Sequence, residues 1–138
     1  LTDVPSAEAV CNNAGGHLAT ISSAVQNAGA YALTAGAGSI TLIGLSDVVT
    51  ENSWIWADGS AVTYTNWASG EPGIDVPSDE DYVYMYYGEE WHDFGIDHGS
   101  GFLCSFSAPT SMPTVTPVPS VTHVSPWVSC GRLRNSFK

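Results

Sequence analysis

The segment WADGSAVTYTNWASGEP, residues 56 to 72, carries most of the information about the fold of this chain. Its ADGS tetrapeptide at 57–60 is predicted to form a hairpin turn, because Asp and Gly accept the backbone angles of tight turns. The next residues, AVTYTNW at 61–67, are rich in β-branched and aromatic side chains, which favour strands. The segment then leads through Glu71 and Pro72 into an acidic stretch. We therefore expect short β segments followed directly by a loop of unusual charge.

That loop, EPGIDVPSDEDY at 71–82, has no Lys or Arg beside it. Over the whole chain, 14 acidic residues stand against three basic ones, all within 132–138, and the net charge is −11. Nucleic acid is not an expected partner, because binding phosphate needs basic side chains. Membrane insertion is not expected either, because no apolar run approaches the roughly 20 residues of a spanning helix. A bound cation would relieve the repulsion among the acids.

The chain up to residue 106 has the pattern of one compact α+β domain. Two helices are predicted, the first in 5–16, starting at Pro5 and Ser6, and the second in 22–36, starting at Ser22 or Ser23. Gly15 and Gly16 are expected to end the first helix, and Gly36 the second. Short strands are predicted in SITLIGLS (39–46), SWIWADG (53–59), AVTYTNW (61–67), YVYMYY (82–87) and GFLCSF (101–106).

The composition changes at Ser107. Residues 107–126 hold five of the eight prolines and no charge, which predicts an extended linker or stalk suited to O-glycosylation. An ordinary disordered tail is the alternative. Residues 127–138 form a basic C-terminal segment with Cys130, and the odd count of three cysteines leaves at least one thiol free or paired with another chain. This tail and the scarcity of lysine indicate an extracellular protein.

Several motifs, in this order and at this spacing, resemble the C-type lectin-like domain family over residues 5–106. The resemblance rests on AEAVCNNAGGHLATI (7–21), LIGLSD (42–47), the segment 56–72, WHD (91–93) and FLC (102–104). They are similar to the family's first helix, its WIGL strand, its W-x-D-G-S…NW…EP run, its WND motif and its closing strand. The resemblance implies a fold in which two helices flank short antiparallel sheets with a long ligand loop.

The resemblance also implies a disulfide between Cys11 and Cys104, worth about 4 to 5 kcal/mol in the chain-entropy model. Tyr82 and Ile96 stand where the family has a second disulfide, so their side chains are expected to pack there instead. LTDV before the first helix is too short for the family's first strand. We expect that strand to be trimmed or replaced, and VTHVSPWVSC (121–130) is one segment that would fill the sheet edge in cis or in trans.

The family holds Ca²⁺ in its acidic loops, and Ca²⁺ prefers several carboxylate and carbonyl oxygens. The positions that match its auxiliary site are Asp47, Glu51, Asp75, Glu80 and Asp81. Those that match its sugar-binding site are Glu71, Glu80 and Asp93, with Gly73 and His92 in place of two asparagines. The alternative interpretation is a solvated acidic loop that maintains solubility.

The two replaced asparagines matter because each amide gives its carbonyl to Ca²⁺ and its NH2 to a sugar hydroxyl. Gly73 offers only its backbone, and imidazole is a poor ligand for Ca²⁺. These changes weaken the prediction of mannose-type recognition, which EPN signals in the family. His92 is alternatively an ordinary exposed histidine, or one ligand of a Zn²⁺ site with Asp93 and His98. Trp67 and Trp91 are expected in the core, and His17 is expected to be structural.

We therefore predict an extracellular module, secreted or on the cell surface, that binds Ca²⁺ and serves in recognition of carbohydrate or glycoprotein or in adhesion. The alternative is a structural module of an extracellular fibre or coat, in which Ca²⁺ only stabilises the loop. Self-association would then use the tail, the unpaired sheet edge or Cys130. A third hypothesis is an ice-binding descendant of the same fold. Catalysis is not expected, because the acids outnumber what a glycosidase needs and no GxSxG motif is present.

Overall fold

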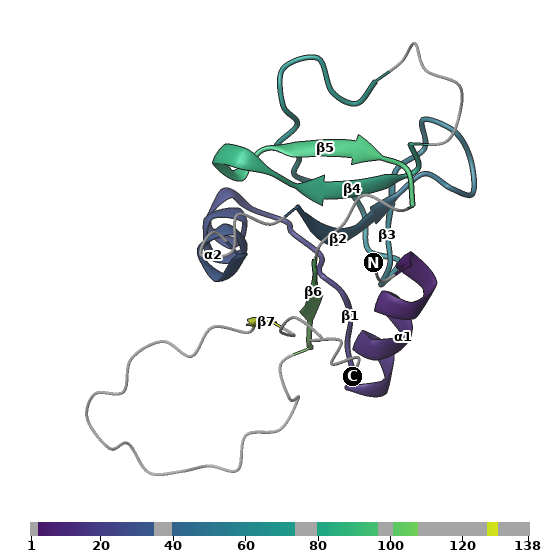
Figure 1. Cartoon of the computed structure of the whole chain (residues 1–138), viewed down its shortest axis with the longest axis vertical. Coiled ribbons are helices and arrows are strands. Elements are labelled where there is room, and N and C mark those ends of the chain that lie inside the picture. The colour runs from purple at the N-terminus through teal and green to yellow at the C-terminus, as the bar shows by residue number, and fades with distance from the viewer. Residues whose placement is uncertain (1–2, 35–39, 74–79, 97–100, 108–126, 130–138) are drawn as a thin grey trace, which may run out of the picture.

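The computed structural model describes residues 3–34, 40–73, 80–96, 101–107 and 127–129 of the chain. These residues form helices and short strands, as the sequence predicted for an α+β domain (Figure 1). In chain order the elements are α1 (Val4–Asn13), β1 (His17–Leu18), α2 (Ala24–Thr34), β2 (Thr41–Ser46), β3 (Ile55–Trp56), β4 (Tyr82–Met85), the 3-10 helix η2 (Tyr87–Glu89), β5 (Trp91–Phe94), β6 (Gly101–Ser105) and β7 (Trp127–Ser129).

The strands form a mixed sheet in the order β1-β6-β2-β4-β5, with β3 beside β2 and β7 beside β6. Strands β2 and β6 run parallel, whereas the other pairs are antiparallel. The helices α1 and α2 lie on opposite sides of β1 and β6 (Figure 1). The described part of the connection from β3 to β4 runs along the β5 side of the sheet, where Trp67 forms an isolated bridge with Trp91. That side therefore holds residues 71–73, the described start of the acidic segment.

Both helices begin with a side-chain cap, although the first begins earlier than predicted. The Oδ1 atom of Asp3 accepts a hydrogen bond from Ser6 N–H at 2.8 Å, so α1 starts at Val4 rather than at Pro5. Gly15, with φ of 85°, follows the helix as predicted. The Oγ atom of Ser23 accepts from Gln26 N–H at 3.3 Å, which confirms Ser23 as a cap of α2. The predicted stop at Gly36 lies outside the described residues.

The core has two clusters of buried side chains. The first surrounds Trp56 and Trp91, whose rings meet edge to face with centroids 5.8 Å apart, and Trp67 packs against it half-buried. This confirms that Trp91 is a core residue. The second contains the disulfide between Cys11 and Cys104, which ties α1 to β6 across 93 residues of sequence. The disulfide that the family resemblance implied is therefore confirmed.

The predicted strand at 61–67 is wrong. Apart from the bridge at Trp67, this segment is irregular, so ADGS forms a turn without a hairpin behind it. The aromatic side chains that suggested a strand serve instead to pack against the core, as shown by the contact of Tyr64 with Trp91 at a centroid distance of 5.7 Å. Conversely, β1 and β5 were not predicted as strands.

The structure shows what occupies the places of two family elements that this sequence lacks, the first strand and the second disulfide. Strand β7 pairs antiparallel with the edge of β6, with Cys104 opposite Val128, so the C-terminal segment fills this edge in cis. Of the two residues at the missing disulfide, Tyr82 packs against the second cluster, whereas Ile96 is 39% exposed. The predicted packing is therefore confirmed for Tyr82 and wrong for Ile96. Cys130 and the linker beyond Ser107 lie outside the described residues.

Candidate functional site

Four of the residues predicted for the sugar-binding site lie together at the middle of β5. Strand β5 carries His92 and Asp93, and the Glu71–Pro72 peptide, which is cis, brings Glu71 and Gly73 beside them. The backbone N–H of Gly73 donates to both carboxylate oxygens of Asp93, at 3.2 and 3.0 Å. The Nδ1 atom of His92 lies 3.0 Å from Oε1 of Glu71, within hydrogen-bond distance. The EPG and WHD motifs, some 20 residues apart in sequence, thus form one cluster.

This cluster is electrostatically unusual. Asp93 is only 4% exposed, and burial together with the neighbouring Glu71 carboxyl raises the pKa of Asp93 to about 6, although the Gly73 N–H favours the charged form. Two carboxyl groups that share one partly buried site disfavour double ionisation unless a cation lies between them. The arrangement is therefore suited to hold a proton or a metal ion.

Aromatic side chains next to His92 were not identified from the sequence. The ring of Phe94 stacks on His92 with a centroid distance of 5.9 Å and an interplanar angle of 11°. The ring of Tyr86 meets His92 edge to face at 5.5 Å. His92 and Phe94 are both half-buried and alternate along β5 with the buried Trp91 and Asp93. Every second side chain of a strand points to the same face, so the order of residues in WHDF would have predicted that His92 and Phe94 share one face.

The residues predicted for the auxiliary metal site are only partly brought together. Asp47 N–H donates to the backbone oxygen of Asp81 at 3.2 Å, so the ends of the two segments meet. Asp47 is 4% exposed; its Oδ2 accepts from Asn52 N–H at 2.8 Å, while its Oδ1 is buried without a hydrogen-bond partner. Glu51 is exposed in the turn after Asp47, and Glu80 is half-buried.

The described ranges contain no group of three or more His, Cys, Asp or Glu side chains arranged to hold a metal ion. Asp75 and His98, two further candidates, lie outside these ranges. The predicted ligands therefore fall into a sugar-site cluster, defined by Glu71, Gly73, His92 and Asp93, and a separate contact between Asp47 and Asp81.

This fold, with its helix-to-strand disulfide and with Glu71 and Gly73 in contact with β5, defines a C-type lectin domain. The sequence matches the Lectin C-type domain family over residues 2–106, and the chain belongs to that family. Among solved structures, it is similar to the carbohydrate-recognition domain of the mouse scavenger receptor C-type lectin. The identity is 33%, the TM-score is 0.67, and the match covers 75% of this chain and 81% of that one.

Two relatives are lectins with a named sugar. The chain is 34% identical over 100 residues to the alpha-N-acetylgalactosamine-specific lectin of Patiria pectinifera, with 67% of this chain and 58% of that protein covered. It is 34% identical over 106 residues to the galactose-specific lectin nattectin of Thalassophryne nattereri, with 75% and 67% covered. The chain thus spans less than two thirds of the first relative. Both names agree with the prediction that this chain is not an enzyme.

None of the helices in the described parts of the chain is long and apolar enough to cross a membrane.

Proposed function

We propose that this chain is an extracellular carbohydrate-recognition module whose sugar-binding site is the sugar-site cluster with a bound Ca²⁺. The observation that carries the proposal is the pair of carboxyl groups of Glu71 and Asp93, held close together with Asp93 almost fully buried. The relatives named for galactose and N-acetylgalactosamine support the assignment of a sugar as the ligand.

The chemistry of the cluster fits a hard divalent cation. Ca²⁺ takes six to eight oxygen ligands, and a cation between the two carboxylates would remove the repulsion that raises the pKa of Asp93. Glu71 and Asp93 would hold the ion, with Glu80 as a further carboxylate. When bound, Ca²⁺ would supply direct coordination to vicinal hydroxyl groups of the sugar.

The neighbouring residues would orient the sugar. His92 would hold the Glu71 carboxylate in place through the contact at 3.0 Å. The half-buried rings of Tyr86 and Phe94 would offer apolar surface to the carbon face of a galactose-type sugar, which has one side free of hydroxyl groups. Because Gly73 lacks the amide of the family's EPN motif, we propose a galactose-type rather than a mannose-type ligand.

A second cation is proposed at the auxiliary position. The Oδ1 atom of Asp47 is a buried acceptor without a partner, and leaving such an atom unpaired is unfavourable by about 1 to 3 kcal/mol. A cation there, shared with Glu51, Asp75, Glu80 and Asp81, would satisfy it. This ion would fix the loop and would not contact the sugar.

The test is a thermal melt near neutral pH in millimolar CaCl2 and then in EDTA. At a hundredfold excess over the dissociation constant, bound Ca²⁺ should add about 2.7 kcal/mol, or several degrees in melting temperature. Asp93→Asn and Glu71→Gln should reduce this shift to the part contributed by the auxiliary cation, whereas Glu90→Gln, which changes an exposed acid outside the cluster, should leave the shift unchanged. Absence of a shift in the unmodified chain would overturn the calcium-dependent site.

Sugar binding is then tested by calorimetric titration with galactose, N-acetylgalactosamine and mannose. We expect binding of the first two in CaCl2, weaker binding of mannose and none in EDTA. A preference for mannose would contradict the role given to Gly73. Binding of all three in EDTA would contradict coordination of the sugar through Ca²⁺.

The pairing of β7 with β6 favours a second candidate function, that of an assembly module. Since β7 pairs along three residues and follows the predicted linker 107–126, the same strand would be able to pair with β6 of another copy. Light scattering with and without reductant tests this. Reductant-sensitive dimers that disappear in Cys130→Ser would support assembly through the tail, and monomers at all concentrations would rule it out.

A further inference from the structure

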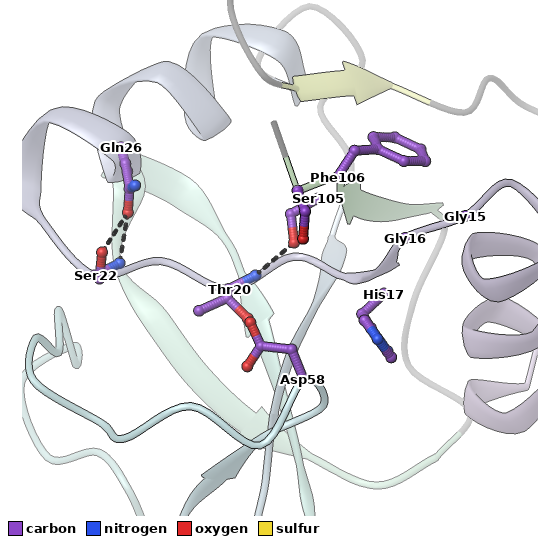
Figure 2. Close-up of a pocket in the computed structure, with 10 residues that line it drawn as sticks. Gly15, Gly16, His17, Thr20, Ser22, Gln26, Asp58, Ser105 and Phe106 are labelled. Atoms are coloured by element: carbon purple, nitrogen blue, oxygen red, sulfur yellow. Dashed lines mark hydrogen bonds between the residues drawn. The ribbon is translucent and has the colours of Figure 1, made fainter. Parts of the chain in front are cut away.

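A pocket of about 400 Å³ lies away from the sugar-site cluster and shares no residue with it. Its walls come from the segment that runs from the turn after α1 through β1 to the first turn of α2, from the turn after β3, and from the end of β6 with the residues that follow it (Figure 2). The disulfide between α1 and β6 and the pairing of β1 with β6 hold the turn after α1 beside the end of β6.

The pocket contains one carboxylate, that of Asp58 in the turn after β3. Its Oδ1 atom accepts hydrogen bonds from Ser60 N–H at 2.9 Å and from Ser60 Oγ at 2.6 Å. Figure 2 shows the side chains of Thr20 and Asp58 pointing toward one another. Partial burial works to raise the pKa of Asp58, but the hydrogen bonds from Ser60, with smaller effects from neighbouring groups, lower it overall. The carboxylate is therefore negatively charged at neutral pH.

Four other residues of the pocket are joined in pairs by hydrogen bonds, namely Ser22 with Gln26 and Thr20 with Ser105. The Oε1 atom of Gln26 accepts from both the N–H and the hydroxyl of Ser22, at 2.7 and 2.9 Å, as the dashed lines in Figure 2 show. The hydroxyl of Ser105 accepts from Thr20 N–H at 3.3 Å. These groups are thus ordered before any ligand arrives, which reduces the entropy lost on binding.

Phe106, the residue after β6, adds an aromatic ring to the lining of the pocket. A Cβ atom at Gly16 would lie 2.7 Å from this ring, so the absence of a side chain at Gly16 lets Phe106 lie over the turn. An aromatic ring in a pocket with a carboxylate is a surface that attracts organic cations.

Nothing in the described part of the pocket neutralises Asp58 strongly. No Lys or Arg lines it, and the Nδ1 atom of His17 already lies 2.9 Å from Glu8 Oε1. The chain as a whole has a net charge of −11, and its Lys and Arg residues are confined to 132–138. A field of this sign repels anions and concentrates cations near the pocket.

We propose that this pocket binds an organic cation through an ammonium or guanidinium group on Asp58, with the apolar part of the ligand against Phe106. The cation comes either from another molecule, such as a lysine side chain or a small amine, or from the basic residues 132–138 of this chain. This site needs neither Ca²⁺ nor sugar, so a test of it does not depend on whether the proposed function is correct.

The experiment is an NMR titration of the full chain in EDTA at low salt with Nα-acetyl-lysine methylamide. We expect saturable shifts of the backbone amides of Gly16, Asp58 and Ser105. The same probe acetylated on Nε, which has no charge, should produce none. Asp58→Asn, which keeps an oxygen for Ser60, should weaken binding about tenfold, the loss expected for one charge-assisted hydrogen bond.

Glu90→Gln is the matched control, because it removes one exposed acid outside the pocket and should leave the affinity unchanged. If Asp58→Asn and Glu90→Gln weakened binding of the probe equally, the proposal would be overturned in favour of unspecific attraction. Chemical shift changes that affect all acidic residues and do not saturate would have the same consequence. The variant with Arg132, Arg134 and Lys138 all changed to Gln distinguishes the two sources of the cation. Tighter binding of the probe to that variant would identify the tail as the resident ligand, and no binding to either chain would overturn the site.

Discussion

At the scale of single residues, the properties of Asp93 depend on its surroundings more than on its position in the sequence. The same side chain in a solvated loop would titrate near its ordinary value. Here it is buried within β5, both of its carboxylate oxygens accept from Gly73 N–H, and it lies beside the Glu71 carboxyl. The raised pKa follows from that packing, which the WHD motif alone does not reveal.

The pH dependence of stability in EDTA should report this group. Between 3.8, the ordinary pKa, and about 6, the folded chain holds the proton on Asp93 and the unfolded chain does not. The contribution of Asp93 to the free energy of unfolding therefore falls as the pH rises through this window. Relative to the unmodified chain, Asp93→Asn should gain roughly 1 kcal/mol between pH 4 and pH 7, after allowance for solvent screening. Urea denaturation at both values measures it, and parallel changes in the two proteins would contradict the assignment.

At the scale of elements, β1 and β2 approach so closely that one position must be glycine. The N–H of Gly44 in β2 donates to Ala19 O at 2.9 Å. A Cβ atom at Gly44 would lie 2.6 Å from Leu18 O, a backbone atom that cannot move away without shifting β1. The sequence shows only a glycine inside an apolar run, and the reason for it appears in the sheet.

Gly44→Ala should therefore destabilise the domain by about 1 to 3 kcal/mol, the usual penalty of overpacking a core. Gly29→Ala is the matched control: it lies within α2, nothing is within 4 Å of its Cβ position, and it should stabilise the domain by about 0.5 to 1 kcal/mol. Thermal melts of both variants measure the two effects. Equal melting temperatures would show that β1 adjusts freely to the added methyl group.

The buried Asn27 connects α2 to the strands that carry the candidate site. It is 1% exposed; its Oδ1 accepts from Trp91 Nε1 at 2.7 Å, and its Nδ2 donates to Glu89 O at 3.1 Å. Asn27→Leu would leave Trp91 Nε1 buried without a hydrogen bond, whereas Glu89 O would keep the bond from Asn66 Nδ2 at 2.7 Å, so we expect a loss of about 1 to 3 kcal/mol. Asn12→Leu, at an exposed position of α1, should change stability by less than about 0.5 kcal/mol. Chemical denaturation distinguishes the two, and similar losses would argue against the Asn27 network.

At the scale of the whole molecule, a disulfide and strand pairing join segments that lie near opposite ends of the domain's sequence. The Cys11–Cys104 disulfide joins α1 to β6, and β6 in turn pairs with β1, β2 and β7. These contacts join residues that are far apart in sequence. Loss of the disulfide or of one strand pair is therefore expected to destabilise the entire sheet rather than one end of the chain.

Removal of the disulfide should have a large effect on global stability. Cys11→Ala together with Cys104→Ala should lower the free energy of unfolding by about 2 to 5 kcal/mol, because the unfolded chain is then less restricted. Cys130→Ser should leave the stability of the monomer nearly unchanged, because no described contact depends on Cys130. Thermal melts without reductant provide the comparison. A double variant as stable as the unmodified chain would show that the sheet closes without the covalent link.

Local signals in the sequence determined the class of fold, the two helices, the strands β2, β4 and β6, and the acidic loop. Apolar runs, helix caps and turn residues act over a few neighbouring positions, so they can be identified from the sequence alone. The family resemblance supplied the disulfide. It was the tertiary structure that turned 61–67 into irregular packing around Trp91 and paired β7 with β6. It also gathered Glu71, Gly73, His92 and Asp93 into one cluster, and it formed the pocket around Asp58. These features depend on contacts between residues distant in sequence, whose geometry exists only after the chain has closed.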